Sequence, residues 1–138
     1  MVVGGILLKG NGARIVTLSG TRSAHTRLLD TFHKLELPAK PTQEDVESFV
    51  QTLQAYCADN DVDLLCLNQR TTGKGTHAGG SASFRNEGII LATSSVPVQL
   101  IHPATTKSAI KKDPIDSVVR PETVDLGKAY DLAFTGLS

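Results

Sequence analysis

The 138-residue chain contains no tryptophan, and its aromatic residues are limited to two tyrosines and four phenylalanines. Proteins that hold single-stranded nucleic acid without sequence preference stack the bases on exposed rings, so a stacking platform is poorly supported here. The chain also has no net charge, because fourteen basic residues balance fourteen acidic ones. The overall positive field of histone-like or polybasic membrane proteins is therefore excluded, and any basic site must be local.

Cysteine and long apolar runs are scarce too. Cys57 and Cys66 fall in apolar segments and are predicted to be buried free thiols, since small cysteine-poor domains are usually reduced and intracellular. The apolar run at the start of the chain, MVVGGILLKG, is too short for a signal peptide or a membrane span, and a lysine interrupts it early. We expect one cytoplasmic domain over residues 1–138, with no membrane contact.

The first third of the chain predicts strands. Residues 2–9 are nearly all apolar and residues 13–18 alternate more loosely, while Gly10-Asn11-Gly12 between them suits a tight turn, so a β-hairpin is predicted. Residues 31–37, TFHKLEL, alternate in a way that is compatible with a third, edge-like strand. Residues 19–30 remain ambiguous.

A helix is predicted after Pro41, because Thr42 and Asp45 form a capping-box-like pair and apolar residues then recur at helical spacing. Residues 59–61 end it. Residues 62–67 are short and almost uniformly apolar, which is typical of a strand buried on both faces in a parallel sheet.

The remaining segments alternate between helix and strand. We predict a helix over residues 81–94, a strand over 98–101, a short helix that begins at His102-Pro103 and ends before Pro114, and a last helix that begins near Pro121. An antiparallel meander followed by parallel strands makes a mixed α/β sheet with flanking helices.

A basic, glycine-rich loop follows the strand at 62–67 and leads into the next helix. Side-chain cations together with open amides at a helix start suit a phosphate or a nucleic-acid backbone. The predicted ligand-binding residues are Arg70, Lys74, His77, Gly79, Gly80, Ser81, Arg85 and Lys107. The alternative is that the glycines only permit an unusual loop, with the cations solvated or paired with Glu87. Lys107 belongs to a basic helix edge with Lys111 and Lys112, and such edges are often simply solvated.

Three segments carry a family resemblance: VGGILLKGNGARIVTLSG, LCLNQRTTGKGTHAGGSASFRNEGIIL and VQLIHPATTKSAIKKDP. The middle one contains R-x-x-G-K-x-x-x-A-G-G-x-x-x-F-R-x-E, which begins at Arg70 and ends at Glu87. The chain resembles the bacterial family known as domain of unknown function 3010, and its order of elements resembles the ribonuclease-H-like fold, with its RuvC-like branch. The resemblance implies a single RNase-H-like domain.

The resemblance also implies that the metal-binding carboxylates of RuvC-like nucleases are missing from this chain. RuvC-like nucleases hold two divalent metals with an aspartate on the first strand, a glutamate at the end of the fourth strand and acids on the final helix. The first two positions correspond here to Leu7 and Asn68, and only Asp131, with Asp125, is left for the final helix. We therefore expect a pseudo-nuclease with no catalytic residue, no metal and no cofactor. The four histidines show no zinc-binding spacing.

Three functions stay open. The first is non-catalytic binding of nucleic acid or a phosphorylated ligand through the basic loop. The second is a protein-interaction module, in which the final helix or a sheet edge forms a homodimer or docks a protein partner. The third is a divergent metal-dependent nuclease that uses Asp125, Asp131 and Glu87 with one metal.

Overall fold

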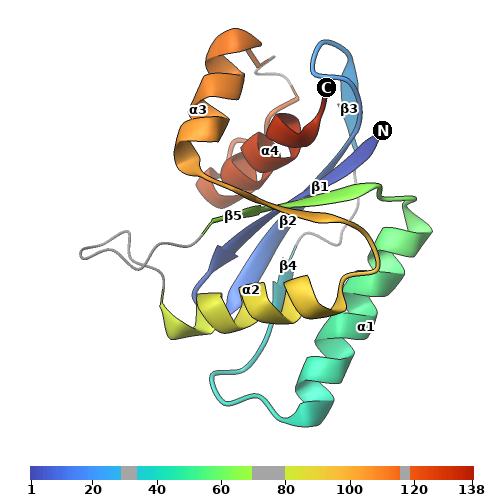
Figure 1. Ribbon diagram of the computed structural model, residues 1–138, viewed down its shortest axis with the longest axis vertical. Helices are drawn as coiled ribbons and strands as arrows, with labels where there is room; N and C mark the ends of the chain where they lie inside the picture. The colour runs from blue at the N-terminus through green and yellow to red at the C-terminus, as the bar shows by residue number, and fades with distance from the viewer. Residues whose placement is uncertain (29–33, 70–79, 116–118) are drawn as a thin grey trace.

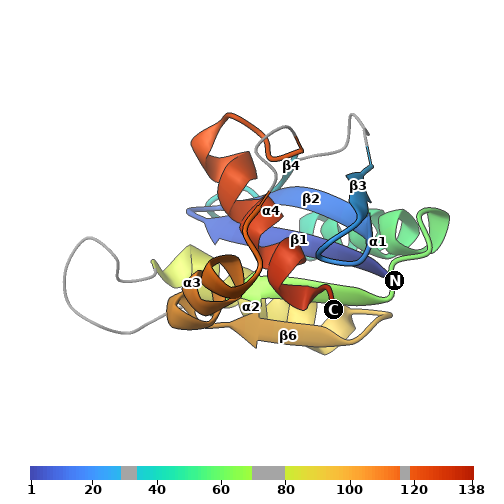
Figure 2. The ribbon, with the colours of Figure 1, turned by 90° about the horizontal axis from the view of Figure 1, so that it is seen from above.

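The computed structural model describes residues 1–28, 34–69, 80–115 and 119–138. A mixed six-stranded sheet lies between two pairs of helices, with α1 and α2 on one face and α3 and α4 on the other (Figures 1 and 2). The fold is therefore the predicted α/β type, and it has three layers.

The centre of the sheet is a hairpin joined to parallel strands. Strands β1 (Val2–Lys9) and β2 (Gly12–Gly20) pair antiparallel around the Gly10-Asn11 turn, as predicted. Strand β5 (Leu64–Asn68) runs parallel to β1, and β6 (Val98–Ile101) runs parallel to β5. The order across the sheet is β3-β2-β1-β5-β6, with β4 also paired to β2.

Two short strands pair with the outer edge of β2. Strand β4 (Lys34–Glu36) confirms the described part of the strand predicted over 31–37, and residues 31–33 lie outside the described chain. Strand β3 (His25–Arg27) lies in the segment that the sequence left ambiguous. It pairs antiparallel with the adjoining end of β2, where Gly20 is the partner of His25 across a turn of residues 21–24. That turn contains no glycine, proline or asparagine, so it lacks the usual sequence signal of a hairpin.

The helices begin and end close to the predicted residues, with one exception. Helix α1 (Gln43–Asp59) has the Thr42–Asp45 capping box, α2 spans Ser81–Thr93, and α3 (Pro103–Lys112) is capped by the His102 ring. Helix α4 (Val124–Gly136) begins after Thr123 rather than near Pro121. No helix among the described residues has the length and apolar character needed to cross a membrane.

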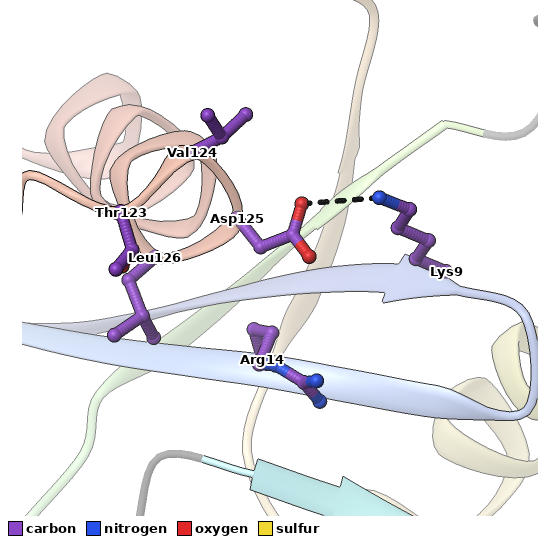
Figure 3. A pocket seen from close by; sticks show the side chains of 6 residues that line it. All are labelled: Lys9, Arg14, Thr123, Val124, Asp125 and Leu126. Atoms are coloured by element: carbon purple, nitrogen blue, oxygen red, sulfur yellow. Dashed lines mark hydrogen bonds and ion pairs between the residues drawn. The ribbon is translucent and has the colours of Figure 1, made fainter.

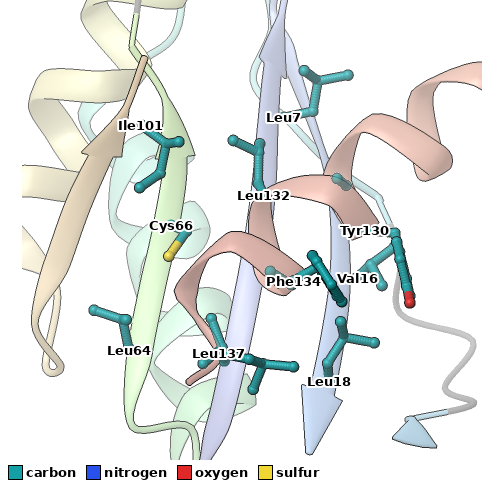
Figure 4. Packing of buried hydrophobic residues seen from close by; sticks show 13 residues of the cluster. Leu7, Val16, Leu18, Leu64, Cys66, Ile101, Tyr130, Leu132, Phe134 and Leu137 are labelled. Carbon is teal, nitrogen blue, oxygen red and sulfur yellow. The ribbon is translucent and has the colours of Figure 1, made fainter. Parts of the chain in front are cut away.

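The sheet divides the core into two clusters. On the α4 side, Leu7 and Cys66 pack with Tyr130 and Phe134 (Figure 4). On the other side, Leu8, Leu65 and Leu67 pack with Phe49 and Cys57. Strand β5 thus contributes to both clusters, as its uniformly apolar sequence predicted, and both cysteines are buried free thiols.

Helix α4 crosses the sheet in close contact with Gly5. A Cβ atom built there would lie 2.0 Å from the backbone oxygen of Ala129 and 2.6 Å from the backbone nitrogen of Ala133. Only glycine leaves room for this crossing. The contact sets α4 directly over β1, beside the carboxyl end of that strand.

Candidate functional site

The parallel strands β1, β5 and β6 end at one edge of the sheet, which is where open α/β sheets bind their ligands. A cavity of about 350 Å³ lies at this edge, between the strand ends, α3 and α4. Its lining residues are Leu7, Asn68, Pro103, Thr106, Lys107, Ile110, Lys128, Asp131 and Leu132. We call this the sheet-end cavity.

The two strands contribute an apolar and an amide side chain. Leu7 is 8 % exposed and belongs to the α4-side core cluster. The carboxamide of Asn68 is held by the neighbouring strand: its Oδ1 accepts a hydrogen bond from the Leu8 backbone N–H at 2.8 Å, and its Nδ2 donates to the Leu8 carbonyl at 3.3 Å. A carboxylate only accepts hydrogen bonds, so it would leave the Leu8 carbonyl facing a negative charge.

The acid that α4 brings to the cavity is already paired. Arg120 donates to both carboxylate oxygens of Asp131, from Nε at 2.9 Å and from Nη2 at 3.0 Å. The hydrogen bond to Asp131 is the main cause of the raised pKa of Arg120. Gly127 leaves room for the guanidinium in this position, because a Cβ atom there would lie 2.9 Å from the guanidinium carbon.

A second cavity, of about 580 Å³, adjoins the first turn of α4 (Figure 3). Lys9 and Arg14 reach it from the hairpin, and Lys9 Nζ lies 3.4 Å from Asp125 Oδ1. Arg14 is the cross-strand partner of Leu7, so this cavity continues the same edge of the sheet. We call it the hairpin cavity.

A model of the family described as "Protein of unknown function (DUF3010)" matches residues 1–136. The chain belongs to this family. No curated protein sequence matches the DUF3010 chain.

Among solved structures, the DUF3010 chain is similar to RuvC from Thermus thermophilus. The RuvC complex with a Holliday junction substrate superposes with a TM-score of 0.75 at 17 % identity, over 98 % of this chain and 92 % of that one. A second Thermus thermophilus RuvC structure gives a TM-score of 0.73 at 15 % identity, with the same coverage. These similarities confirm the predicted RNase-H-like fold, which this chain shares with RuvC.

The two divalent metals expected of RuvC-like nucleases do not fit the residues of the DUF3010 protein. Hard cations need several carboxylate oxygens. Leu7 offers none, Asn68 is engaged with Leu8, and Asp131 and Asp125 each face a cation. Within the described residues, no group of three or more His, Cys, Asp or Glu side chains is placed to hold a metal ion.

The predicted ligand-binding residues fall into three groups. Arg70, Lys74, His77 and Gly79 lie outside the described residues. Gly80 is the N-cap of α2 and provides no side-chain cap, and its carbonyl accepts from the Ser83 backbone N–H at 3.1 Å. Ser81 is exposed. Neither Gly80 nor Ser81 lines the sheet-end cavity.

Arg85 and Lys107 have different surroundings. Arg85 donates through Nε to the side chain of Asn86 at 3.2 Å and through Nη1 to the Ala39 carbonyl at 3.4 Å, and the structure shows no ion pair between it and Glu87. Lys107, by contrast, lines the sheet-end cavity beside Asn68. The assignment of both residues to ligand binding stays a prediction.

The sequence did not indicate Lys128 or Arg120 as parts of the site. Lys128 shares a helix face with Asp131, at a spacing of three residues, and that was the available signal. Arg120 had none, because it precedes the helix and the loop that folds it back onto Asp131 has no recognisable motif.

Proposed function

We propose that the DUF3010 protein binds nucleic acid or a phosphorylated ligand at the carboxyl end of its sheet and does not cleave it. The observation that carries this proposal is the charge arrangement around the sheet-end cavity. Lys107 and Lys128 are exposed and form no ion pair with a described carboxylate, whereas Asp131 is fully paired with Arg120. The edge therefore favours anions over metal ions.

Basic residues from the hairpin extend this edge. Lys9 and Arg14 line the adjoining hairpin cavity, where Lys9 lies 3.4 Å from Asp125 and Arg14 lies 3.9 Å from Glu36. The predicted basic loop with Arg70 and Lys74 follows β5 in the sequence. Cations spaced along one edge suit the repeated phosphates of a nucleic-acid backbone. The similar RuvC structure was solved with a Holliday junction, which supports a four-way junction as the first ligand to test.

Fluorescence anisotropy with labelled four-way junction, duplex and single-stranded DNA, all in EDTA, tests the binding. Affinity should fall with salt, each phosphate contact adding about 0.9 to the log–log slope for duplex DNA and about 0.7 for single strands. Arg70→Ala with Lys74→Ala should lower both affinity and slope. Lys111→Ala is the matched control, because Lys111 is exposed on α3 and lines neither cavity. Salt-insensitive or undetectable binding would rule out nucleic acid as the ligand.

The absence of cleavage is tested by incubating the same DNAs with Mg²⁺ or Mn²⁺. We expect the substrates to remain intact. Cleavage that co-purifies with the protein and disappears in Asp131→Asn would instead establish the divergent nuclease, with Asp131 as its acid.

One observation favours the interaction module as a second candidate. Strand β6 pairs only with β5 among the described strands, and its Leu100 is 36 % exposed. An edge strand with an exposed apolar residue is suited to pairing with another chain. Sedimentation equilibrium tests this: a dimer that Leu100→Lys dissociates, in a protein that does not bind DNA, would support the second candidate over the first.

A further inference from the structure

The sheet-end cavity has the dimensions of a small-molecule site. Its volume of about 350 Å³ lies within the usual range of ligand pockets, about 300 to 1,000 Å³. The cavity must therefore be considered as a site in its own right.

Much of the cavity wall is apolar. Leu7 and Leu132 are largely buried members of the α4-side cluster (Figure 4), and Ile110 packs against the same cluster from α3. Water in contact with such a wall is displaced favourably by an apolar group. The part of the ligand that enters is thus expected to be an apolar or aromatic body.

The rim of the cavity carries two cations from two different helices. Lys107 of α3 and Lys128 of α4 are both exposed lining residues without a described ion-pair partner. Asp131, the only carboxylate among the described lining residues, has both oxygens occupied by Arg120. Two lysines match a group with two negative charges, and a phosphomonoester carries about −1.5 to −2 at pH 7.

Asn68 gives the cavity a polar side chain that can form hydrogen bonds with a ligand. Its carboxamide has two N–H donors and two lone-pair sites, and one of each is used by Leu8. Within the described residues, no partner takes its second donor or its second acceptor site, and the Leu8 backbone fixes the orientation of this cavity-lining side chain.

We infer that the sheet-end cavity binds, without a metal ion, a phosphomonoester attached to a compact apolar or aromatic body. The phosphate lies between Lys107 and Lys128, and the body lies against Leu7, Ile110 and Leu132. This inference rests on the proposed function, because both assign an anion rather than a metal to this edge of the sheet. It goes further by naming a small ligand and the side chains that hold it.

Isothermal titration calorimetry in EDTA tests the inference with four probes: 1-naphthyl phosphate, inorganic phosphate, 1-naphthol and adenosine 5′-monophosphate. We expect 1-naphthyl phosphate to bind about tenfold or more tightly than either of its two halves, inorganic phosphate and 1-naphthol. If adenosine monophosphate binds tighter still, the natural ligand is a nucleotide. If it binds more weakly, the ligand is another organic phosphate.

Variants separate the two parts of the site. Lys107→Ala with Lys128→Ala should weaken 1-naphthyl phosphate about tenfold or more, and Lys111→Ala should leave it unchanged. Ile110→Trp, which fills the cavity without changing charge, should remove the advantage of 1-naphthyl phosphate over inorganic phosphate. Melting temperatures verify that each variant is folded.

The inference is overturned if 1-naphthyl phosphate binds no tighter than inorganic phosphate, if the double lysine variant binds it as well as the original protein, or if binding needs added metal. Failure of the proposed function looks different. DNA binding with no small-phosphate binding would refute the cavity ligand alone, and small-phosphate binding without DNA binding would refute the nucleic-acid ligand alone.

Discussion

Asn68 and Leu8 face each other across β5 and β1 through two hydrogen bonds, in which the carboxamide of Asn68 accepts from the Leu8 N–H and donates to the Leu8 carbonyl. The side chain thus continues the pairing of the parallel strands beyond their last backbone partners, Ile6 and Leu67. At the position where the RuvC-like resemblance implies a metal ligand, this chain has a residue that holds the sheet together.

Replacing Asn68 with aspartate should therefore destabilise the protein. The variant loses the donor to the Leu8 carbonyl and places a charge beside it, at a cost of about 1 to 3 kcal/mol at pH 7. Protonation restores an O–H donor, so the pKa of the new carboxyl should be raised above its ordinary value of about 3.9. The contribution of the protonated carboxyl to the free energy of unfolding is then fully present below about pH 4, and it is lost as the pH rises through the raised pKa.

Urea denaturation of Asn68→Asp and of the original protein at pH 4 and pH 7 measures the loss in the free energy of unfolding at each pH. Gln51→Glu on the exposed side of α1 is the matched amide-to-acid control. An equal deficit at both pH values, or a deficit no larger than that of the control, would show that the Leu8 contacts contribute little.

Gly5→Ala should be among the most damaging single-methyl substitutions in the chain. The added Cβ meets backbone atoms of Ala129 and Ala133, which cannot turn aside as a side chain can, so a loss of about 3 kcal/mol or more is expected. Gly88→Ala on the exposed side of α2 is the control, because nothing lies within 4 Å of its Cβ position. It should gain about 0.5 to 1 kcal/mol in the free energy of unfolding. Similar effects at the two sites would refute the close α4 crossing.

The effect of Gly127→Ala on the free energy of unfolding should depend on the residue at position 120: close to zero with arginine there and stabilising with alanine. In the original protein the methyl group displaces the Arg120 guanidinium from Asp131, and the lost pair, of about 1 kcal/mol for so exposed a partner, opposes the gain in helix propensity. In an Arg120→Ala background only the gain of about 1 kcal/mol remains. A double-mutant cycle measured by chemical denaturation gives the coupling. Additive effects would mean that Gly127 has no part in placing Arg120.

The buried thiols should make the fold sensitive to alkali. Burial raises the pKa of both Cys57 and Cys66 from 9.0 to about 11, so the folded state keeps protons that the unfolded chain releases. Their stabilisation is complete below about pH 9 and is lost as the pH rises to about 11. Denaturation of the original protein and of Cys57→Ala/Cys66→Ala between pH 7 and pH 11 isolates this contribution. Parallel pH dependences in the two proteins would exclude it.

Local sequence signals predicted much of the fold. The hairpin follows from Gly10-Asn11-Gly12 and α1 from its capping box, because both depend on residues close together in the chain. Strand β3 and the start of α4 lack such a signal. Residues 21–24, which join β2 to β3, contain no typical hairpin-turn residue, and the N-cap Thr123 of α4 makes no side-chain cap hydrogen bond.

The site was less predictable for the same reason. Lys107 and Lys128 lie on different helices and meet only through the packing of α3 against α4, and Arg120 reaches Asp131 across a turn of irregular backbone. The basic loop, with Arg70 and Lys74, was conspicuous because its cations are neighbours in sequence. Its role in binding stays a prediction.

The division of the core by the sheet gives each layer its own chemical probe. Cys66 belongs to the cluster beneath α4, and Cys57 to the cluster beneath α1, with the sheet between them. A thiol reacts only when its surroundings open, so the labelling rate of each cysteine under native conditions reports the opening of one layer. Two single-cysteine variants would thus show whether the layer on the α4 side of the sheet, which bears the sheet-end cavity, opens independently of the layer on the α1 side.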